Sequence, residues 1–209
     1  MTYLSMSMHG SVVSLMICFI FTHIYGRVGE TRLLFEKRLN DSGGFQYRDE
    51  KVLSNRKRGM PYLGFLNFLP QKSELKIYYK TINGRKPLAK DIRINSMLEG
   101  WDIHIIYVNE KSVFELYKRS EKINDFEFAA LLKIQSGQSF WKKKDPTKPS
   151  PKNDMSALGY DFLRDDNLLK AKKIGNNTLI IFSSDFDSFI EKEQESEQKE
   201  KLPASIKGF

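Results

Sequence analysis

The sequence contains one cysteine, Cys18, and three histidines. His9 and His23 lie close to the amino terminus, so the chain after residue 26 has no thiol and a single histidine, His104. A disulfide framework needs paired cysteines, and the usual zinc sites need several Cys or His ligands. His104 falls in the middle of a strand that we expect to be buried, where a core histidine is the usual interpretation. We therefore predict no disulfide, no metal site and no Ser-His or Cys-His catalytic pair beyond residue 26.

Glycine-rich phosphate-binding loops are also missing. The pair Gly43-Gly44 does not follow a strand and open a helix with the spacing of a P-loop or a dinucleotide-binding turn. No cofactor is predicted for this chain.

The first 26 residues contain no Lys, Arg, Asp or Glu, so the net charge of +8 belongs to the remainder. Within them, residues 12–25 (VVSLMICFIFTHIY) form an apolar block that is shorter than the roughly 20 residues needed to cross a bilayer and typical of a signal-peptide core. We predict that residues 1–26 are a signal peptide and that the protein is secreted or periplasmic. The alternative is a membrane anchor formed by residues 11–25, because a basic residue before the core and a small-residue cleavage site are both lacking. A third interpretation is a buried helix or strand of the folded domain.

The clearest structural signal runs from Trp101 to Gly137. Residues 101–108 are apolar on both faces, as a central strand covered on two sides would be. The pair Asn109-Glu110 then predicts a turn, and residues 113–118 a second strand, with a short helix over 112–119 as the alternative. Asn124 and Glu127 have the spacing of a capping box, which predicts a helix from Asp125 to Ser136 that ends at Gly137.

Further strands are predicted on both sides of this stretch. They are residues 45–53 at a sheet edge, 60–69 with a bulge, 75–82 followed by an Asn83-Gly84 turn, 91–97, 158–163, 168–174 and 178–183. The last of these is apolar on both faces, and we expect it to lie centrally beside the Trp101 strand. A second helix is predicted from about Ser184 and is expected to fade after Ile190.

These elements predict the α+β class, with one largely antiparallel sheet of about five to seven strands and two helices. We expect a single domain over residues 27–190, an exposed loop rich in Lys and Pro over 142–154, and a charged, partly disordered tail over 191–209.

Two basic runs with aromatic neighbours are the most suggestive binding feature. They consist of Arg56, Lys57 and Arg58, and of Lys142, Lys143 and Lys144. Basic patches with nearby aromatics suit nucleic acid, anionic glycans or a membrane surface, although such runs are usually solvated loops. An exported protein meets little nucleic acid, so the expected partner is an anionic polymer or a membrane surface.

Aspartates supply the remaining catalytic candidates. They lie in two groups: Asp161, Asp165 and Asp166, and Asp185 and Asp187. Acid pairs can hydrolyse glycosides or bind calcium, but the first group falls on a turn and the second at a helix start, where Asp is favoured for backbone reasons. We therefore expect a non-catalytic exported binding or structural module, with a carboxylate-dependent hydrolase as the alternative.

Overall fold

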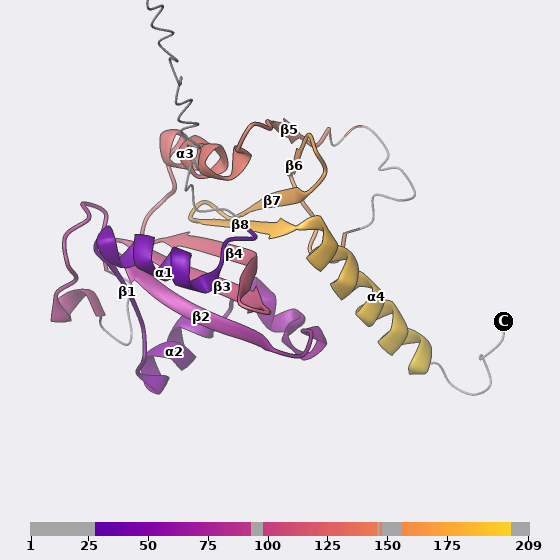
Figure 1. Cartoon of the computed structure of the whole chain (residues 1–209), viewed down its shortest axis with the longest axis horizontal. Helices are drawn as coiled ribbons and strands as arrows, with labels where there is room; N and C mark the ends of the chain where they lie inside the picture. Colours follow the sequence, from indigo (N-terminus) through magenta and orange to yellow (C-terminus); the bar gives the residue numbers. More distant parts are fainter. Residues whose placement is uncertain (1–27, 93–97, 146, 148–155, 202–209) are drawn as a thin grey trace, which may run out of the picture.

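The structure of the protein, a computed structural model, describes residues 28–92, 98–145, 147 and 156–201. The predicted leader, most of the predicted Lys/Pro loop, residues 93–97 and the last eight residues lie outside this part. The described chain is α+β, with four α-helices around a single antiparallel sheet of eight strands in the order β1-β2-β3-β4-β8-β7-β6-β5 (Figure 1). The predicted fold class is confirmed, whereas the predicted counts of strands and helices are too low.

The hairpin of β3 (Trp101–Val108) and β4 (Lys111–Arg119) lies at the centre of the sheet, as the sequence predicts. Asn109 and Glu110 connect the strands with positive φ angles of 49° and 63°, the conformation of a two-residue hairpin turn. On the outer side of β3 lies β2 (Ser73–Lys80), and outside it the short edge strand β1 (Gly44–Gln46). This half of the sheet is therefore a four-stranded meander.

The other half is reached through a helix. After β4 the chain forms α3 (Asp125–Ser136) and then returns through β5 (Trp141–Lys143), β6 (Phe162–Arg164), β7 (Leu169–Ile174) and β8 (Thr178–Ser183). Strand β8 pairs with β4, so it lies one strand away from the Trp101 strand and not beside it as predicted. The two halves join there into a continuous sheet.

Both faces of the sheet are covered. On one face α1 (Arg32–Asp41) and α3 pack over Ile105, Tyr107 and Ile181. On the other face, the 3-10 turns η1 (Pro61–Gly64) and η2 (Leu66–Phe68) and helix α4 (Ser184–Glu200) cover Phe114 and Phe182, and α2 (Glu50–Lys57) covers Ile77 and Tyr79. This two-sided burial explains why β3 and β8 are apolar on both faces.

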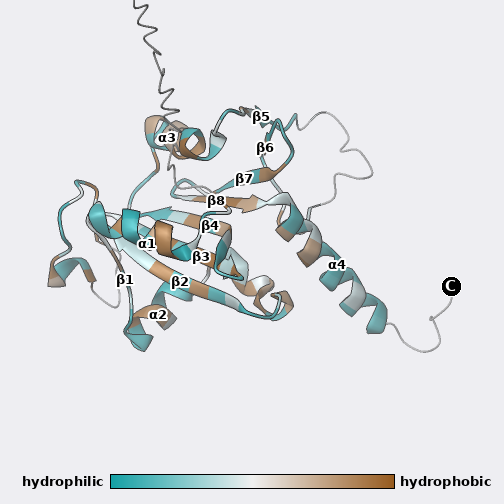
Figure 2. Ribbon diagram, viewed as in Figure 1, coloured by the Kyte–Doolittle hydropathy of each residue, from teal (hydrophilic) through white to brown (hydrophobic). Residues whose placement is uncertain are grey.

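The two predicted helices begin where expected. The Asn124 side chain accepts from the N–H of Glu127 at 2.8 Å and the Glu127 carboxylate accepts from the N–H of Asn124 at 3.1 Å, which completes the predicted capping box. Ser183 caps α4 by accepting from the N–H of Phe186. The helix continues to Glu200, and Figure 2 shows hydrophobic residues where α4 meets the sheet and hydrophilic ones further along.

Several predictions for the amino-terminal half are wrong. Residues 32–41, for which no element is predicted, form α1. Residues 50–53, the end of the edge strand predicted over 45–53, instead begin α2, which Asp49 caps by accepting from the N–H groups of Lys51 and Val52. Residues 60–69 form η1 and η2 instead of a bulged strand, because Pro61 opens a turn at the first helical position. Residues 89–92 form the 3-10 turn η3, so the strand predicted over 91–97 does not begin at Asp91, and its residues 93–97 lie outside the described part of the chain.

Two smaller differences concern the carboxyl-terminal half. The strand expected over 158–163 is limited to Phe162–Arg164, and β5 forms within the start of the expected Lys/Pro loop. No helix in the described part of the chain has both the length and the apolar character needed to cross a bilayer.

Candidate anion-binding groove

A groove of about 720 Å³ lies where β5, β6 and β7 meet the amino-terminal end of α3. Lys143, the last residue of β5, and Lys144, which follows it, line this groove. Lys172 and Lys173 of β7 line it as well. Two predicted basic residues are thus brought together with two that lie almost 30 positions further along the chain. We refer to it as the lysine groove.

The groove exists because β6 is shorter than β7. Strand β6 pairs only with Lys170 and Ala171, so no strand among the described residues pairs with the far half of β7 on that side. The carboxylate of Asp161 accepts a 2.8 Å hydrogen bond from the N–H of Lys173 and so replaces part of the missing strand. Its own N–H donates to the carbonyl of Ala171 at 2.9 Å. The chain before β6 is therefore fixed against β7, and the space beside it is left unfilled by the residues that the structure describes.

The charge of the groove is positive. Four lysines and two aspartates, Asp125 and Asp161, line it, which leaves an excess of two positive charges. Among the residues that the structure describes, Lys143, Lys172 and Lys173 form no ion pair with a carboxylate. The ammonium of Lys172 donates instead to the carbonyl of Leu158 at 2.8 Å. Such cations are available to compensate the charge of an anion.

Aromatic rings form the apolar part of the wall. The ammonium of Lys144 lies 4.3 Å from the centre of the Tyr160 ring, and that of Lys173 lies 5.3 Å from the centre of the Phe128 ring. These distances are within the range of cation–π contacts, which orient the ammonium groups without neutralising them. Two of the four groove lysines therefore lie against aromatic rings.

The six predicted anion-binding residues do not form one site. Lys143 and Lys144 line the lysine groove, and Lys142 is exposed with its ammonium 5.2 Å from the centre of the Phe140 ring. Lys57 and Arg58 lie at the end of α2, which packs on the opposite half of the sheet. The structure therefore places the two basic runs on different halves of the sheet.

Arg56 is buried and does not belong to a surface patch. Only 6% of it is exposed, and its guanidinium contacts the carboxylate of Asp102 at 3.2 Å. The hydroxyl of Tyr47 donates to the same carboxylate at 3.2 Å. This ion pair has a structural role, because loss of either partner would leave an unpaired charge buried inside the protein.

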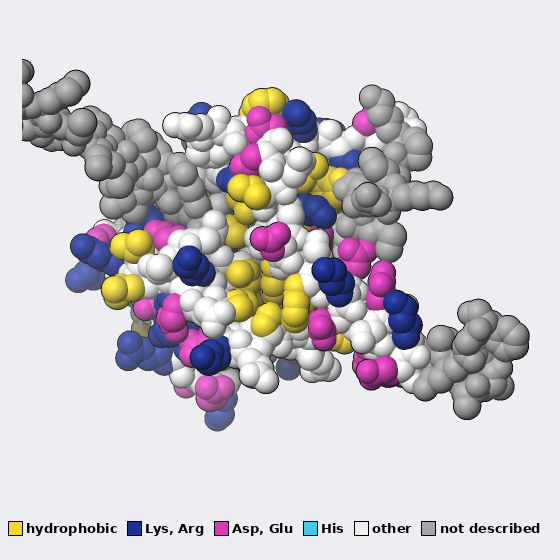
Figure 3. All heavy atoms as spheres, turned by 45° about the vertical axis from the view of Figure 1, so that its right-hand side comes forward, with side chains coloured by type: hydrophobic (Ala, Val, Ile, Leu, Met, Phe, Trp, Pro, Cys, Tyr) yellow, Lys and Arg dark blue, Asp and Glu magenta, His cyan; other side chains and the backbone are white. Residues whose placement is uncertain are grey.

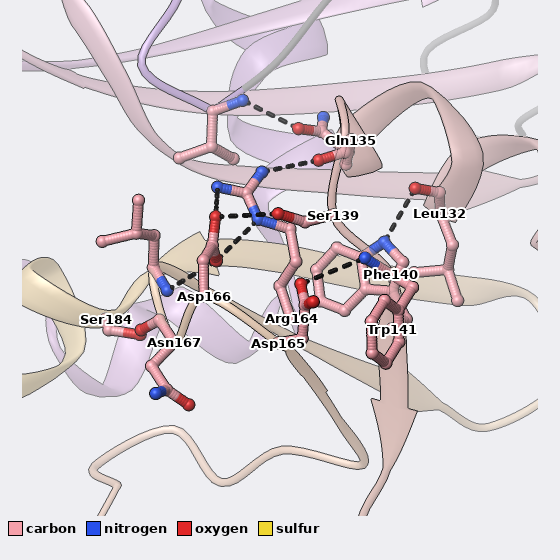
Figure 4. A network of polar contacts seen from close by, with 12 residues as sticks. Leu132, Gln135, Ser139, Phe140, Trp141, Arg164, Asp165, Asp166, Asn167 and Ser184 are labelled. Atoms are coloured by element: carbon pink, nitrogen blue, oxygen red, sulfur yellow. Dashed lines mark hydrogen bonds and ion pairs between the residues drawn. The ribbon is translucent and has the colours of Figure 1, made fainter.

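Asp165 and Asp166 hold the β5–β6 hairpin in place (Figure 4). Asp166 is bound by Arg164 at 2.8 Å and by the hydroxyl of Ser139 at 3.2 Å, and Arg164 lowers the pKa of the Asp166 carboxyl. Asp165 accepts from the N–H of Phe140 at 3.1 Å. Arg164 also donates to the carbonyl of Gln135, which connects the hairpin to α3. These carboxylates have structural partners.

Asp185 and Asp187 lie in the first turn of α4, where negative charge favours the helix. Asp185 is exposed, whereas Asp187 is fully buried and forms a 2.7 Å ion pair with Lys170. Asp187 also accepts from the N–H of Leu158 at 3.1 Å. Of the five predicted aspartates, only Asp161 lines the lysine groove.

His104 is a core residue, as predicted. Its Nδ1 lies 2.7 Å from the hydroxyl of Tyr62, and burial lowers its pKa to about 3, so the imidazole is neutral. Its Nε2 has no hydrogen-bond partner in the described part of the chain. No group of three or more His, Cys, Asp or Glu side chains that could hold a metal ion occurs among the described residues.

The sequence pattern does not identify Lys172, Lys173, Phe128 or Tyr160 as site residues. The run LKAKKI predicts a strand, and its three lysines within four positions are the one visible signal of a basic site. Phe128 fits the apolar face of the predicted helix, and Tyr160 lies within the predicted strand 158–163. No periodic pattern in the sequence predicts that these residues lie next to Lys143 and Lys144.

We compared the chain with protein-family models, with curated proteins and with solved structures, and none of the three comparisons gives a match. The function is therefore inferred from the geometry of the chain itself.

Proposed function

We propose that this protein is an exported, non-catalytic binding module that holds an anionic polymer in the lysine groove. The observation that carries the proposal is the convergence of Lys143, Lys144, Lys172 and Lys173 on one groove with aromatic walls. Three of these ammonium groups have no carboxylate partner in the described chain, and the groove is open at the edge of a sheet.

A polymer is a better candidate than a single small anion. The groove volume of about 720 Å³ is large for one phosphate or sulfate group, and its cations come from two strands. Polymers with sulfate, phosphate or carboxylate groups along a chain would contact several lysines at once. Sugar or other ring faces of such a polymer could stack against Phe128 or Tyr160.

The face shown in Figure 3 also supports a local site, because its Lys and Arg side chains are interspersed with Asp and Glu side chains. Charges mixed in this way attract an anion only weakly, so tight binding would need a place where cations are concentrated.

Export remains part of the proposal and is supported by the uncharged, apolar residues 1–26. Sequencing the amino terminus of natively produced protein tests it. We expect either a chain shortened near residue 26 or a full-length chain in the membrane fraction. A cytoplasmic protein that still begins at Met1 would contradict export.

Anion binding is tested by titrating a heparin oligosaccharide into the protein at several salt concentrations. We expect affinity to fall steeply with salt, because each lysine contact releases counterions. Changing Lys143, Lys144, Lys172 and Lys173 to Gln should reduce the slope of log affinity against log salt by about 3 units.

A matched control carries the same loss of charge elsewhere. Four exposed lysines outside the groove are suitable for change to Gln: Lys37, Lys51, Lys90 and Lys133. This control should keep most of the slope and affinity. Equal losses in the two variants would show general charge attraction and would refute the groove as the site.

No observation favours the hydrolase alternative. Asp165, Asp166 and Asp187 each have structural partners, and Asp161 is the one member of the predicted set in the lysine groove. A pair of carboxylates facing a shared cleft, which glycoside hydrolysis requires, is not formed by these residues in the lysine groove.

A further inference from the structure

A second groove, of about 290 Å³, lies between α1 and α3 and is largely apolar. Its floor is formed by Trp101 and Ile103 of β3 and Tyr117 of β4. It is separate from the lysine groove, because α3 directs Phe128 to the lysine groove and Phe126 to this one. We refer to it as the apolar groove.

The rim of the apolar groove carries exposed hydrophobic side chains. Phe126, Ala130 and Ile134 follow one another at four-residue spacing along α3, and Phe126 is 82% exposed. Leu34, one turn before the groove-lining Arg38, is 46% exposed on α1, and Ile82 is 47% exposed after β2. Grouped apolar side chains on a surface indicate an interaction site, whereas scattered ones do not.

Charges around the apolar groove favour an anionic partner. Its one lining carboxylate, Glu127, is bound by Arg119 at 2.7 Å. Lys80 also lines it, and its ammonium donates to the carbonyl of Ser42 without a carboxylate partner in the described chain. The face therefore combines protruding apolar groups with an uncompensated cation.

The start of the described chain is fixed to α3, the helix that forms one side of the apolar groove. The N–H of Val28 donates a 2.8 Å hydrogen bond to the side chain of Gln135, the residue after Ile134 on α3. The apolar block of residues 12–25 therefore ends three residues before a point fixed to the carboxyl-terminal end of α3. Three residues reach at most about 10 Å, so an anchor formed by residues 11–25 would hold this end of α3, and with it Ile134 at the rim of the groove, close to the bilayer.

We propose that the face formed by the apolar groove and its rim lies against the surface of an anionic lipid membrane. Leu34, Ile82, Phe126 and Ile134 enter the boundary between headgroups and acyl chains, and Lys80 meets the headgroup charge. This arrangement resembles the interfacial binding of amphipathic helices, in which an apolar face is buried about 5–10 Å and cations contact anionic lipids.

Spin labels on the full chain test this proposal. Cys18 is the only cysteine, so a Cys18→Ala background allows one nitroxide to be placed at Phe126→Cys or at Ile82→Cys. A label at Leu168→Cys is the matched control, because Leu168 is 57% exposed and lies outside the apolar groove. Accessibility to oxygen and to a water-soluble nickel complex is measured with and without vesicles of phosphatidylcholine and phosphatidylserine.

On binding to vesicles, labels at 126 and 82 should gain oxygen accessibility and lose accessibility to nickel by about twofold or more, while the label at 168 should not change. Vesicles without phosphatidylserine should give a smaller effect. A label at 126 that stays accessible to water on bound protein would overturn the proposal. Shielding of the label at 126 from water in the absence of vesicles would also overturn the proposal. Shielding that rises with protein concentration would indicate that a second copy of the chain covers the groove. Shielding that does not depend on concentration would indicate that the chain's own leader covers it.

Discussion

The backbone N–H of Lys173 donates a 2.8 Å hydrogen bond to the carboxylate of Asp161, so a side chain takes the place of a strand at the open edge of β7. This bond connects the fold to the proposed function. It fixes the wall of the lysine groove, and it also places a negative charge among the lysines that would bind an anion.

Changing Asp161 to Asn separates these two roles. Asn keeps a carbonyl that can accept from Lys173 and removes the charge, so we expect heparin affinity to rise about 2- to 5-fold at low salt. Changing Asp161 to Ala also removes the hydrogen bond and should lower the free energy of unfolding by about 1 kcal/mol. Affinity by titration and stability in urea measure the two effects. An unchanged affinity in the Asn variant would show that Asp161 does not face the ligand.

Asp187 has a structural role in this account. Changing it to Ala leaves the buried ammonium of Lys170 unpaired, which should lower the free energy of unfolding by about 3–5 kcal/mol. Changing the exposed Asp185 to Ala is the control and should alter stability by no more than about 0.5 kcal/mol. Urea unfolding followed by circular dichroism compares them. Similar stability in the two variants would be inconsistent with the buried ion pair.

Truncation of core side chains in the central strands should also lower the stability of the fold. Ile105 and Phe182 are fully buried on opposite faces of the sheet, in separate clusters. Changing either to Ala should lower the free energy of unfolding by about 2–5 kcal/mol, because the change removes apolar contacts and leaves a cavity. A loss well below 1 kcal/mol at either position would contradict its place in the core.

His104 should make the fold sensitive to acid. Its pKa is about 3 in the folded protein and about 6.5 when unfolded, so the unfolded chain binds more protons between these values. Its contribution to stability is therefore complete above about pH 6.5 and is lost as the pH falls toward 3. Stability falls with falling pH because the buried site accommodates only the neutral imidazole.

A His104→Gln variant isolates this effect. Between about pH 6 and 4 the wild type should lose about 1.4 kcal/mol more per pH unit than the variant, which has no titrating group at this position. Urea titrations at several pH values measure the difference in slope. Parallel slopes would show that His104 is not held neutral by burial.

The parts of the fold that the sequence predicted are those set by local pattern. The apolar run of β3, the half-buried pattern of β4 and the capping box at Asn124 can each be recognised within a few residues, and all three elements form as expected. The wrong predictions have weak local patterns. Helix α1 buries only Phe35 and Leu39, and α2 buries Val52 together with Arg56, whose burial depends on Asp102 some 46 positions away.

The candidate site was predictable only in part for the same reason. Lys143 and Lys144 were recognised as a basic run, but Lys172 and Lys173 join them through the β5–β6–β7 meander. The open edge that makes the lysine groove follows from the shortness of β6, which spans only Phe162–Arg164. Arg56 was predicted to be an exposed cation, and its ion pair with Asp102 is visible only in three dimensions.

Mapping the reactivity of individual lysines tests the central claim most directly. Surface lysines are acetylated briefly with and without a heparin oligosaccharide, and each position is quantified by mass spectrometry. We expect the ligand to protect Lys143, Lys144, Lys172 and Lys173 and to leave Lys37, Lys51, Lys90 and Lys133 unchanged. Uniform protection of all lysines, or protection that leaves out the lysine groove, would contradict the account.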